Sequence, residues 1–250
     1  MWWVSGVGQT RAVTETPALT RRREPAVLLG IGVVALIVSA IGAASIGTWF
    51  LEVLAALIAG VVLVVTYRRF PLTPLAYRLI LVHAIVLMIG GHWTYAEVPA
   101  GDWVRDTFGL ERNPYDRLGH FAQGFIPAVV AREVLLRRTP LRPGRWLFAL
   151  TICVVMAVSA TWELFEWLAA VVGGSSADDF LGTQGDVWDT QWDMFLAGCG
   201  AITSLLLLSR LHDRQLAGGL LQEARSPAAP GTSGRRLAQE VVQEAGQPDR

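Results

Sequence analysis

The stretch VLLGIGVVALIV at residues 27–38 decides the class of fold, because every residue in it is apolar or glycine. It lacks the alternation of apolar and polar residues that a membrane β-strand shows. Extended to residues 25–46, the stretch reaches the ~20 apolar residues that a helix needs to cross the hydrocarbon layer of a membrane. It therefore predicts a transmembrane helix.

Five further segments share this length and apolar character, namely residues 48–66, 75–93, 118–136, 146–171 and 191–209. Each is predicted to be helical, because an open sheet cannot satisfy its backbone polar groups in lipid. The sequence therefore predicts an all-α fold, a polytopic membrane helix bundle with six transmembrane helices. The predicted organisation is a cytoplasmic N-terminal segment at 1–24, a transmembrane domain at 25–209 and a cytoplasmic tail at 210–250.

The composition agrees with a membrane protein. Apolar residues make up 52% of the chain and charged residues 17%, with a mean hydropathy of +0.41, which is too apolar for an ordinary soluble domain. The 21 basic residues, all arginine, balance 21 acidic residues, so no basic surface typical of nucleic-acid binding is expected. Cys153 and Cys199 lie in separate apolar stretches and form neither a disulfide framework nor a metal-binding pair. The predicted partner is membrane lipid, and nucleic acid is excluded.

Arginines are concentrated in alternate connecting segments. Residues 1–24, 67–78 and 137–145 are rich in arginine, whereas 94–117 and 172–190 hold most of the acidic loop residues. Because arginine-rich segments stay in the cytoplasm, both termini are predicted to be cytoplasmic and the acidic loops to face outward.

Two terminal features bear on the boundaries of the helical domain. The first helix could instead be a cleaved signal peptide, but its ~20 apolar residues exceed the ~7–15 of a signal core and favour an uncleaved helix. The tail at 210–250 is rich in Ala, Gly, Pro, Ser, Arg and Glu, so it is predicted to be disordered, with His212 solvated.

Ionisable residues gather near the outer ends of the predicted helices. Within a span such residues cost ~2.5–3.5 kcal/mol each, so they indicate functional positions. From the helical rise of ~1.5 Å per residue, Glu163 and Glu166 lie roughly 25–30 Å from the inner edge. The other members of the outer set are Glu52, His92, Asp116, His120, Gln123, Asp189 and Asp193, while His83 lies nearer the middle.

The spacing of these residues brings several onto shared helix faces. Asp116, His120 and Gln123 follow an i, i+4, i+7 pattern, and Glu163 and Glu166 are three residues apart. Carboxylates and imidazole together suit a divalent metal ion or a general acid/base pair. We predict a site in which His120, Glu163, Glu166 and Asp193 are metal ligands or catalytic groups, supported by Asp116, Gln123, Asp189 and His92. A divalent cation is the one cofactor that this pattern suggests.

Structural roles for the same residues stay open. Glu163 and Glu166 could pair with outer arginines, His120 could be a helix-packing hydrogen bonder, and Glu52 could complement a helix dipole. Seven of the ten tryptophans also fall near the outer surface, namely Trp49, Trp93, Trp103, Trp162, Trp167, Trp188 and Trp192. They indicate an aromatic belt at the headgroup level, or a platform for a lipid headgroup or sugar ring.

Three strings carry a resemblance to a known family. YDRLGHFAQGF (115–125), TWELFEW (161–167) and FLGTQGDVWDTQWDM (180–194) resemble the YjdF-like family of bacterial inner-membrane proteins of unknown function, over about residues 75–205. The resemblance implies a multi-pass protein of the bacterial inner (cell) membrane and implies no activity.

A looser likeness is to VanZ-like proteins, which carry Asp-x-x-x-His on one helix, Glu-x-x-Gln on a later one, and then an Asp-led helix. Asp116 and His120 fit the first element. Glu163 fits the second, with Glu166 in place of the glutamine, and Asp189 fits the third. VanZ-like proteins are associated with lipophilic glycopeptide antibiotics at the cell surface. The departures from the pattern add negative charge to this chain.

Taken together, the residues predict an integral membrane protein of uncharacterised activity with an outward-facing polar, acidic cavity. Its ligand would be a divalent metal ion or a lipid-headgroup-like molecule, and metal-assisted chemistry on an envelope lipid is one use. Two alternatives stay open. One is a structural scaffold whose outer acids satisfy loop arginines, and the other is a proton- or ion-coupled transporter. A transporter needs a polar path inward, for which His83 is the ionisable candidate near mid-depth.

Overall fold

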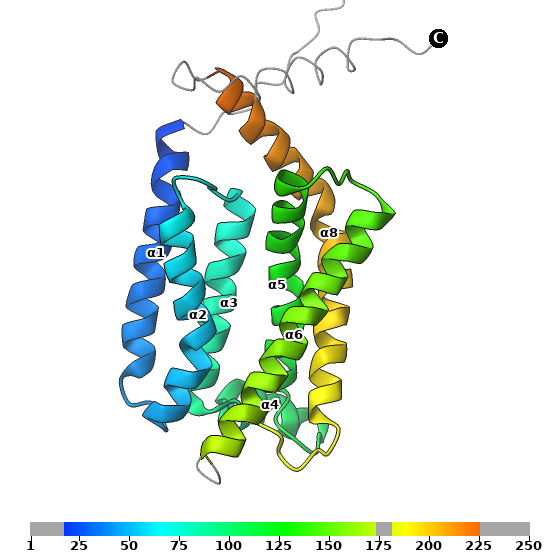
Figure 1. Ribbon diagram of the computed structural model, residues 1–250. Helices are drawn as coiled ribbons and strands as arrows, with labels where there is room; N and C mark the ends of the chain where they lie inside the picture. Colours follow the sequence, from blue (N-terminus) through cyan, green and yellow to red (C-terminus); the bar gives the residue numbers. More distant parts are fainter. Residues whose placement is uncertain (1–17, 174–181, 226–250) are drawn as a thin grey trace, which may run out of the picture.

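The computed structural model describes residues 18–173 and 182–225, and its regular structure is helical throughout (Figure 1). The helices are α1 (Ala18–Ala40), α2 (Ile46–Thr66), α3 (Pro74–Trp93), the 3-10 helix η1 (Tyr95–Glu97), α4 (Pro99–Phe108), α5 (Tyr115–Arg138), α6 (Arg145–Gly173) and α8 (Asp189–Arg225). The described residues contain no strand, which confirms the all-α prediction for that part of the chain.

Within residues 18–173 and 182–225, five helices are long and apolar enough to cross a membrane. The candidate spans are Arg23–Ala40, Ile46–Thr66, Pro74–Trp93, Arg145–Gly173 and Asp189–Gly218. α5 runs alongside them with comparable length, but charged residues occupy both of its ends, so its composition does not mark it as a span. The sixth span and the orientation of the bundle therefore stay predictions.

The structure differs from the sequence-based boundaries at three places. α1 spans Ala18–Ala40 instead of residues 25–46. α8 continues to Arg225 instead of ending near residue 209, and His212, predicted to be solvated, is only 1% exposed. The segment 94–117, expected to be a loop, contains η1 and α4. The helical continuation over 210–225 was not predicted because this stretch is polar in composition, and composition does not show which face of a helix packs inward. Residues 1–17 and 226–250, which hold most of the expected terminal segments, lie outside the described residues.

Local signals explain where several helices begin and end. Ser45 precedes α2 in an extended conformation and accepts the backbone N–H of Thr48, and Thr73 accepts that of Ala76 at the start of α3. Pro74 follows Thr73 as the first residue of α3, where its missing N–H costs nothing. The residue after α4 is Gly109, whose left-handed conformation (φ 64°) ends that helix.

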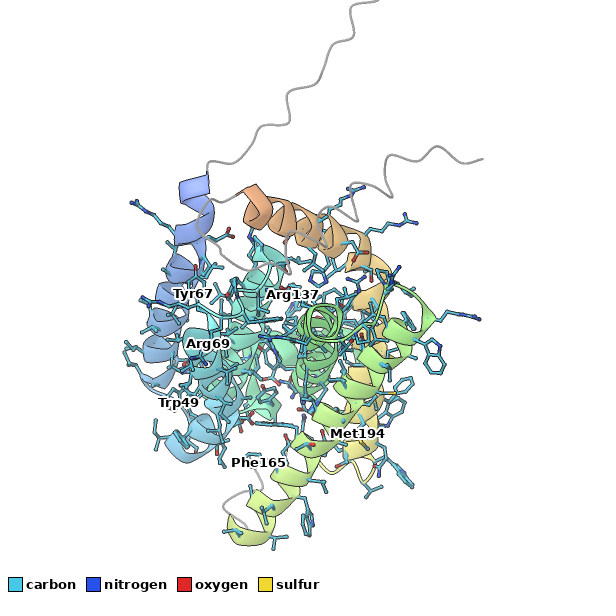
Figure 2. The ribbon with its side chains drawn as sticks, turned by 45° about the horizontal axis from the view of Figure 1, so that its top comes forward. Trp49, Tyr67, Arg69, Arg137, Phe165 and Met194 are labelled. Carbon is cyan, nitrogen blue, oxygen red and sulfur yellow. The ribbon has the colours of Figure 1, made fainter. Side chains whose placement is uncertain are left out.

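The helices form two groups that meet along α3 and α5 (Figure 1). On one side α3 packs against α1 and α2, and on the other α5 packs against α6 and, most extensively, α8. Side chains fill the interior between the two groups, as the view with side chains drawn shows (Figure 2). The start of α1 and the end of α8 lie at one end of the bundle and α4 lies at the other.

Two glycines allow α5 and α8 to pack backbone to backbone. A Cβ atom added at Gly124 of α5 would lie 1.8 Å from the carbonyl oxygen of Ala197, and one added at Gly200 of α8 would lie 2.1 Å from that of Phe121. Small residues at such crossings let helix backbones approach closely in membranes. The crossing brings the first turns of α5 and α8 together at the α4 end of the bundle.

A fully partnered polar network joins α3, α5 and α8 at the end opposite α4. Glu133, 0% exposed, accepts the Thr73 backbone N–H at 3.1 Å and its hydroxyl at 2.8 Å, an Arg137 N–H at 2.8 Å, and His212 Nε2–H at 3.1 Å. Arg132 lies 3.1 Å from His212 Nδ1. Since a guanidinium only donates, Nδ1 accepts and Nε2 carries the proton that binds Glu133. Because both carboxylate oxygens of Glu133 have hydrogen-bond partners, we interpret this network as one that holds the helices together.

Candidate functional site

The candidate site lies at the α4 end of the bundle, where the first turns of α5 and α8 meet. Asp116 and His120 stand one turn apart on α5, and Asp193 stands on α8. All three are buried, and each offers a ligand atom such that these atoms lie within 4.8 Å of one another. His120 Nε2 is 3.4 Å from Asp116 Oδ1 and 3.9 Å from Asp193 Oδ1. We call these three residues the His120 cluster.

Glu163 of α6 faces the other nitrogen of the same imidazole. Its Oε1 lies 3.6 Å from His120 Nδ1, and the side chain is 6% exposed. His120 Nδ1, Glu163 Oε1 and Asp193 Oδ1 are all buried and have no hydrogen-bond partner. Because nearly all buried polar atoms in proteins have a partner, this group of unsatisfied atoms requires an explanation.

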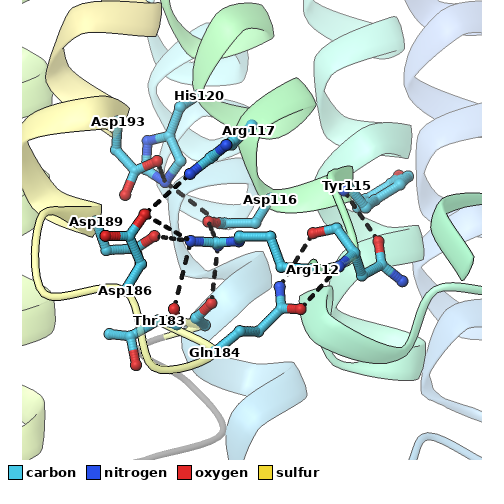
Figure 3. Close-up of polar contacts among 12 residues, drawn as sticks. Arg112, Tyr115, Asp116, Arg117, His120, Thr183, Gln184, Asp186, Asp189 and Asp193 are labelled. Atoms are coloured by element: carbon cyan, nitrogen blue, oxygen red, sulfur yellow. Dashed lines mark hydrogen bonds and ion pairs between the residues drawn. The ribbon is translucent and has the colours of Figure 1, made fainter. Parts of the chain in front are cut away.

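Arg112, in the connection between α4 and α5, supplies positive charge beside the cluster (Figure 3). Its guanidinium donates to Asp116 Oδ2 at 3.0 Å and to Asp189, the first residue of α8. It also donates to the carbonyl oxygens of Gly182 at 3.1 Å and Thr183 at 3.3 Å. Burial lowers the pKa of Arg112, but the hydrogen bond and charge of Asp189, with the nearby Asp116, raise it overall, so the guanidinium stays charged.

The segment before α8 covers this end of the site. The Gln184 side chain accepts the Asn113 backbone N–H at 2.9 Å and donates to the Asn113 carbonyl at 3.0 Å. Asp186 accepts from Arg117 of α5 at 2.9 Å. A Cβ at Gly182 would contact the Asp116 carboxylate at 3.6 Å, so the backbone lies directly against the site. The His120 cluster is therefore enclosed.

Three of the residues predicted for the site lie outside both the cluster and its neighbours Glu163 and Asp189. Glu166 accepts the indole N–H of Trp162 at 2.6 Å. His92 Nδ1 lies 2.9 Å from the Ser39 carbonyl oxygen, which ties the end of α3 to α1. Gln123 is half-buried, one turn further along α5 from His120, with no hydrogen bond among the described residues. Of the predicted set, the structure thus brings together Asp116, His120, Glu163, Asp189 and Asp193.

Sequence reasoning missed the role of Arg112. The outer arginines, Arg112 among them, were considered only as partners of Glu163 or Glu166, whereas in the described chain Arg112 pairs with Asp116, Asp186 and Asp189. The i, i+4 spacing of Arg112 and Asp116 was the available signal.

Glu52 also lies closer to the site than its expected role of complementing a helix dipole requires. It is 5% exposed on α2 and interacts electrostatically with Asp116 and His120. A buried carboxyl on α2 therefore forms part of the surroundings of the site.

Comparison with known proteins places the chain in a family. The family model described as "Predicted membrane protein (DUF2238)" matches residues 24–214. The chain belongs to this family. Inner membrane protein YjdF of Escherichia coli (strain K12) is 55% identical to this DUF2238 member over 169 residues, which cover 68% of this chain and 81% of the relative. No solved structure matches the chain.

These findings confirm the resemblance to YjdF-like proteins. The looser likeness to VanZ-like proteins gains no support from them. The DUF2238 member is a membrane protein of uncharacterised function with several apolar helices.

Proposed function

We propose that this DUF2238 member is a multi-pass inner-membrane protein that binds a divalent transition-metal ion at the His120 cluster. The cluster would lie near the outward-facing surface of the inner membrane. The supporting observation is that three buried side chains place ligand atoms within 4.8 Å of one another, close to unsatisfied polar atoms. The family and the E. coli relative support the membrane location.

The distances in the cluster suit a small metal ion. Two ligand atoms bound at about 2.1 Å in tetrahedral geometry lie about 3.4 Å apart. His120 Nε2 is 3.4 Å from Asp116 Oδ1 and 3.9 Å from Asp193 Oδ1, and all three ligand atoms lie within 4.8 Å of one another, so the two carboxylates would draw closer together around a bound ion. One imidazole with two carboxylates favours Zn²⁺ or Mn²⁺ over Ca²⁺ and Mg²⁺, which prefer oxygen ligands alone.

Glu163 fits an orienting role better than that of a ligand. It faces His120 Nδ1, the nitrogen that points away from Asp116 and Asp193. Metal-bound histidines commonly donate their second N–H to a carboxylate, which fixes the ring and strengthens binding. Glu166 lies one turn further along α6 and accepts the indole N–H of Trp162. We therefore assign it no ligand role and regard it as an acid that neighbours the site.

The proposed chemistry is metal-assisted hydrolysis or transfer on an envelope lipid, at a buried polar site that the segment before α8 covers. A metal ion with three protein ligands keeps a position for water or substrate and activates what binds there. Trp188 and Trp192, 63% and 45% exposed, flank Asp189 and Asp193 at the level expected for lipid headgroups. The position of these side chains supports a lipid as the substrate class.

A structural role is the second candidate, and Arg112 favours it. Asp116 and Asp189 already neutralise this guanidinium, as outer acids in a scaffold would. A scaffold role does not explain the burial of Asp193, whose one partner within ion-pair distance among the described residues is His120. It also does not explain the buried Glu163 Oε1, which has no hydrogen-bond partner. The two candidates therefore make different predictions for Asp193 and Glu163.

Transport has less support. Between the site and the Glu133 network, Ala128, Val155 and Ala201 pack as a buried apolar cluster with Ile152. A proton or ion path through the middle of α5, α6 and α8 would have to cross this cluster.

Elemental analysis of the purified, detergent-solubilised chain tests the proposal. We expect stoichiometric metal in the wild type and its loss in Asp193→Asn, with no loss in the matched control Asp106→Asn on exposed α4. Glu163→Gln should weaken metal binding about 10- to 100-fold, whereas Glu97→Gln, an exposed control, should not. Metal content that is the same in Asp193→Asn and Asp106→Asn would leave the scaffold as the better account.

A further inference from the structure

Two arginine side chains converge on one oxygen atom at the edge of the site (Figure 3). Asp186 Oδ2 lies 2.9 Å from Arg117 Nη2 and 3.8 Å from Arg112 Nη1. Asp186 belongs to the segment before α8, and its side chain is 23% exposed, so it lies at the boundary between the site and its surroundings. The Asp186 carboxylate thus accepts a hydrogen bond from Arg117 and lies within ion-pair distance of Arg112.

Each guanidinium retains one donor without a partner, its Nε, while both Nη atoms of Arg112 already donate to Asp116, Asp189 and two backbone carbonyl oxygens. The Nε atoms of Arg112 and Arg117 are buried and have no hydrogen-bond partner, and the Arg112 side chain is only 10% exposed. The Arg117 guanidinium also lies over the Trp192 ring, 5.5 Å from its centroid, which holds it in place. An anion with several oxygens could accept from more of these donors than one carboxylate does.

The same place adjoins the proposed metal position. Asp116 presents Oδ1 to His120 and Oδ2 to Arg112, so one carboxylate separates the metal position from the guanidiniums. With a divalent ion bound and Asp186 turned away, the four positive charges of the ion, Arg112 and Arg117 equal the four carboxylates of Asp116, Glu163, Asp189 and Asp193. Glu52 and Glu166 are further acids near this group. Without the ion, the carboxylates outweigh the guanidiniums and repel a further anion.

We propose that Arg112 and Arg117 form a binding site for a phosphate group, which takes the place of the Asp186 carboxylate. The inference rests on the proposed function, because the metal ion supplies the charge that lets an anion enter. It identifies the chemical class of ligand as a phosphate monoester or free phosphate, and Asp186 as an internal competitor for the site.

The surface beside Asp186 suits a lipid as the source of the phosphate. Val187 and Trp188 follow Asp186 and are 85% and 63% exposed, at the end of the bundle where the candidate spans end. A lipid headgroup and free inorganic phosphate share the same recognition chemistry, so the experiment uses one probe for each.

The test uses the full chain in detergent, first loaded with Zn²⁺ or Mn²⁺ and assayed for metal content. Inorganic phosphate and dihexanoyl phosphatidic acid are then titrated separately, with dihexanoyl phosphatidylcholine as the lipid control, and the thermal shift gives the affinity. The Asp186 side chain accepts the backbone N–H of Trp188 at 2.9 Å, and the amide oxygen in Asp186→Asn can still accept it. The substitution therefore removes only the negative charge that competes with phosphate. The variant should bind phosphate about threefold more tightly. Arg117→Gln should bind about tenfold more weakly.

Arg105→Gln is the matched control, because Arg105 lies on α4 at the same end and pairs with Asp102 and Asp106 away from the site. It should leave phosphate affinity unchanged. Binding of phosphatidic acid alone supports a lipid source, and binding of inorganic phosphate as well supports the shared chemistry. The inference is overturned if metal-loaded wild type binds neither probe, or if Arg117→Gln and Asp186→Asn both match the wild type. Failure of the proposed function is seen separately, as wild-type protein that retains no metal.

Discussion

Replacing Gly124 by alanine should force α5 away from α8. The added Cβ would lie 1.8 Å from the carbonyl oxygen of Ala197, a backbone atom that cannot rotate aside. Since a carbon–oxygen contact needs about 3.3 Å, the two helices must separate by roughly 1.5 Å at the crossing. Overpacking of this kind costs about 2–3 kcal/mol.

The assay is thermal unfolding of the full chain in detergent. For a chain of this size, that loss corresponds to a fall of about 4–12 °C in Tm. Gly60→Ala on α2 is the matched control, because a Cβ there meets nothing within 4 Å. In a helix interior alanine is favoured over glycine by up to about 1 kcal/mol, so the control should be neutral or slightly stabilising.

The same substitution should also affect the site, because His120 stands on α5 and Asp193 on α8. We expect metal affinity to fall in Gly124→Ala and to stay unchanged in Gly60→Ala. Equal Tm values for the two variants would refute the reasoning about the crossing. A lower Tm with unchanged metal affinity would show that the cluster does not depend on the separation of α5 and α8.

Three further outcomes are expected. Metal-induced thermal stabilisation should shrink as pH falls from 8 to 5, because protons compete with the metal for His120 and the carboxylates, and thermal shift at stepped pH measures this. His212→Ala should lower Tm by several degrees, because it removes the buried hydrogen bonds of the ring to Glu133 and Arg132 and leaves a cavity, whereas Arg214→Ala, at an exposed position of α8, should not. In intact cells expressing variants with Cys153 and Cys199 replaced by serine, a membrane-impermeant thiol reagent should label a cysteine at position 97 but not at 142, and the reverse pattern would invert the predicted orientation.

The helical class and much of the site could be predicted from the sequence. Apolar length alone located the helices, because the bilayer sets a minimum length and the helix satisfies its own backbone. The i, i+4 spacing of Asp116 and His120 and the depth of Glu163 along α6 placed these residues at one end of the bundle. Residues on regular helices obey a fixed rise, so their relative depth follows from counting.

The remaining features depend on contacts that periodicity does not encode. Arg112 and Gln184 act from connecting segments, where no repeat fixes the direction of a side chain. His92 has the depth of a site residue, but it bonds to Ser39 of α1, since depth does not specify which neighbour a helix face meets. His212 looked solvated because α8 is polar beyond residue 209, yet its ring faces Arg132 and Glu133.

The polar contacts at the two ends of α5 have a mechanical consequence for its partner. Near one end Asp116 and Asp189 share Arg112, and near the other Glu133 binds His212. A slip of α8 along α5 by one turn, about 5.4 Å, would break both sets at once while burying charges opposite apolar residues. The polar contacts at both ends therefore fix the register of α8 relative to α5. Piston-like sliding is thus unavailable to this pair.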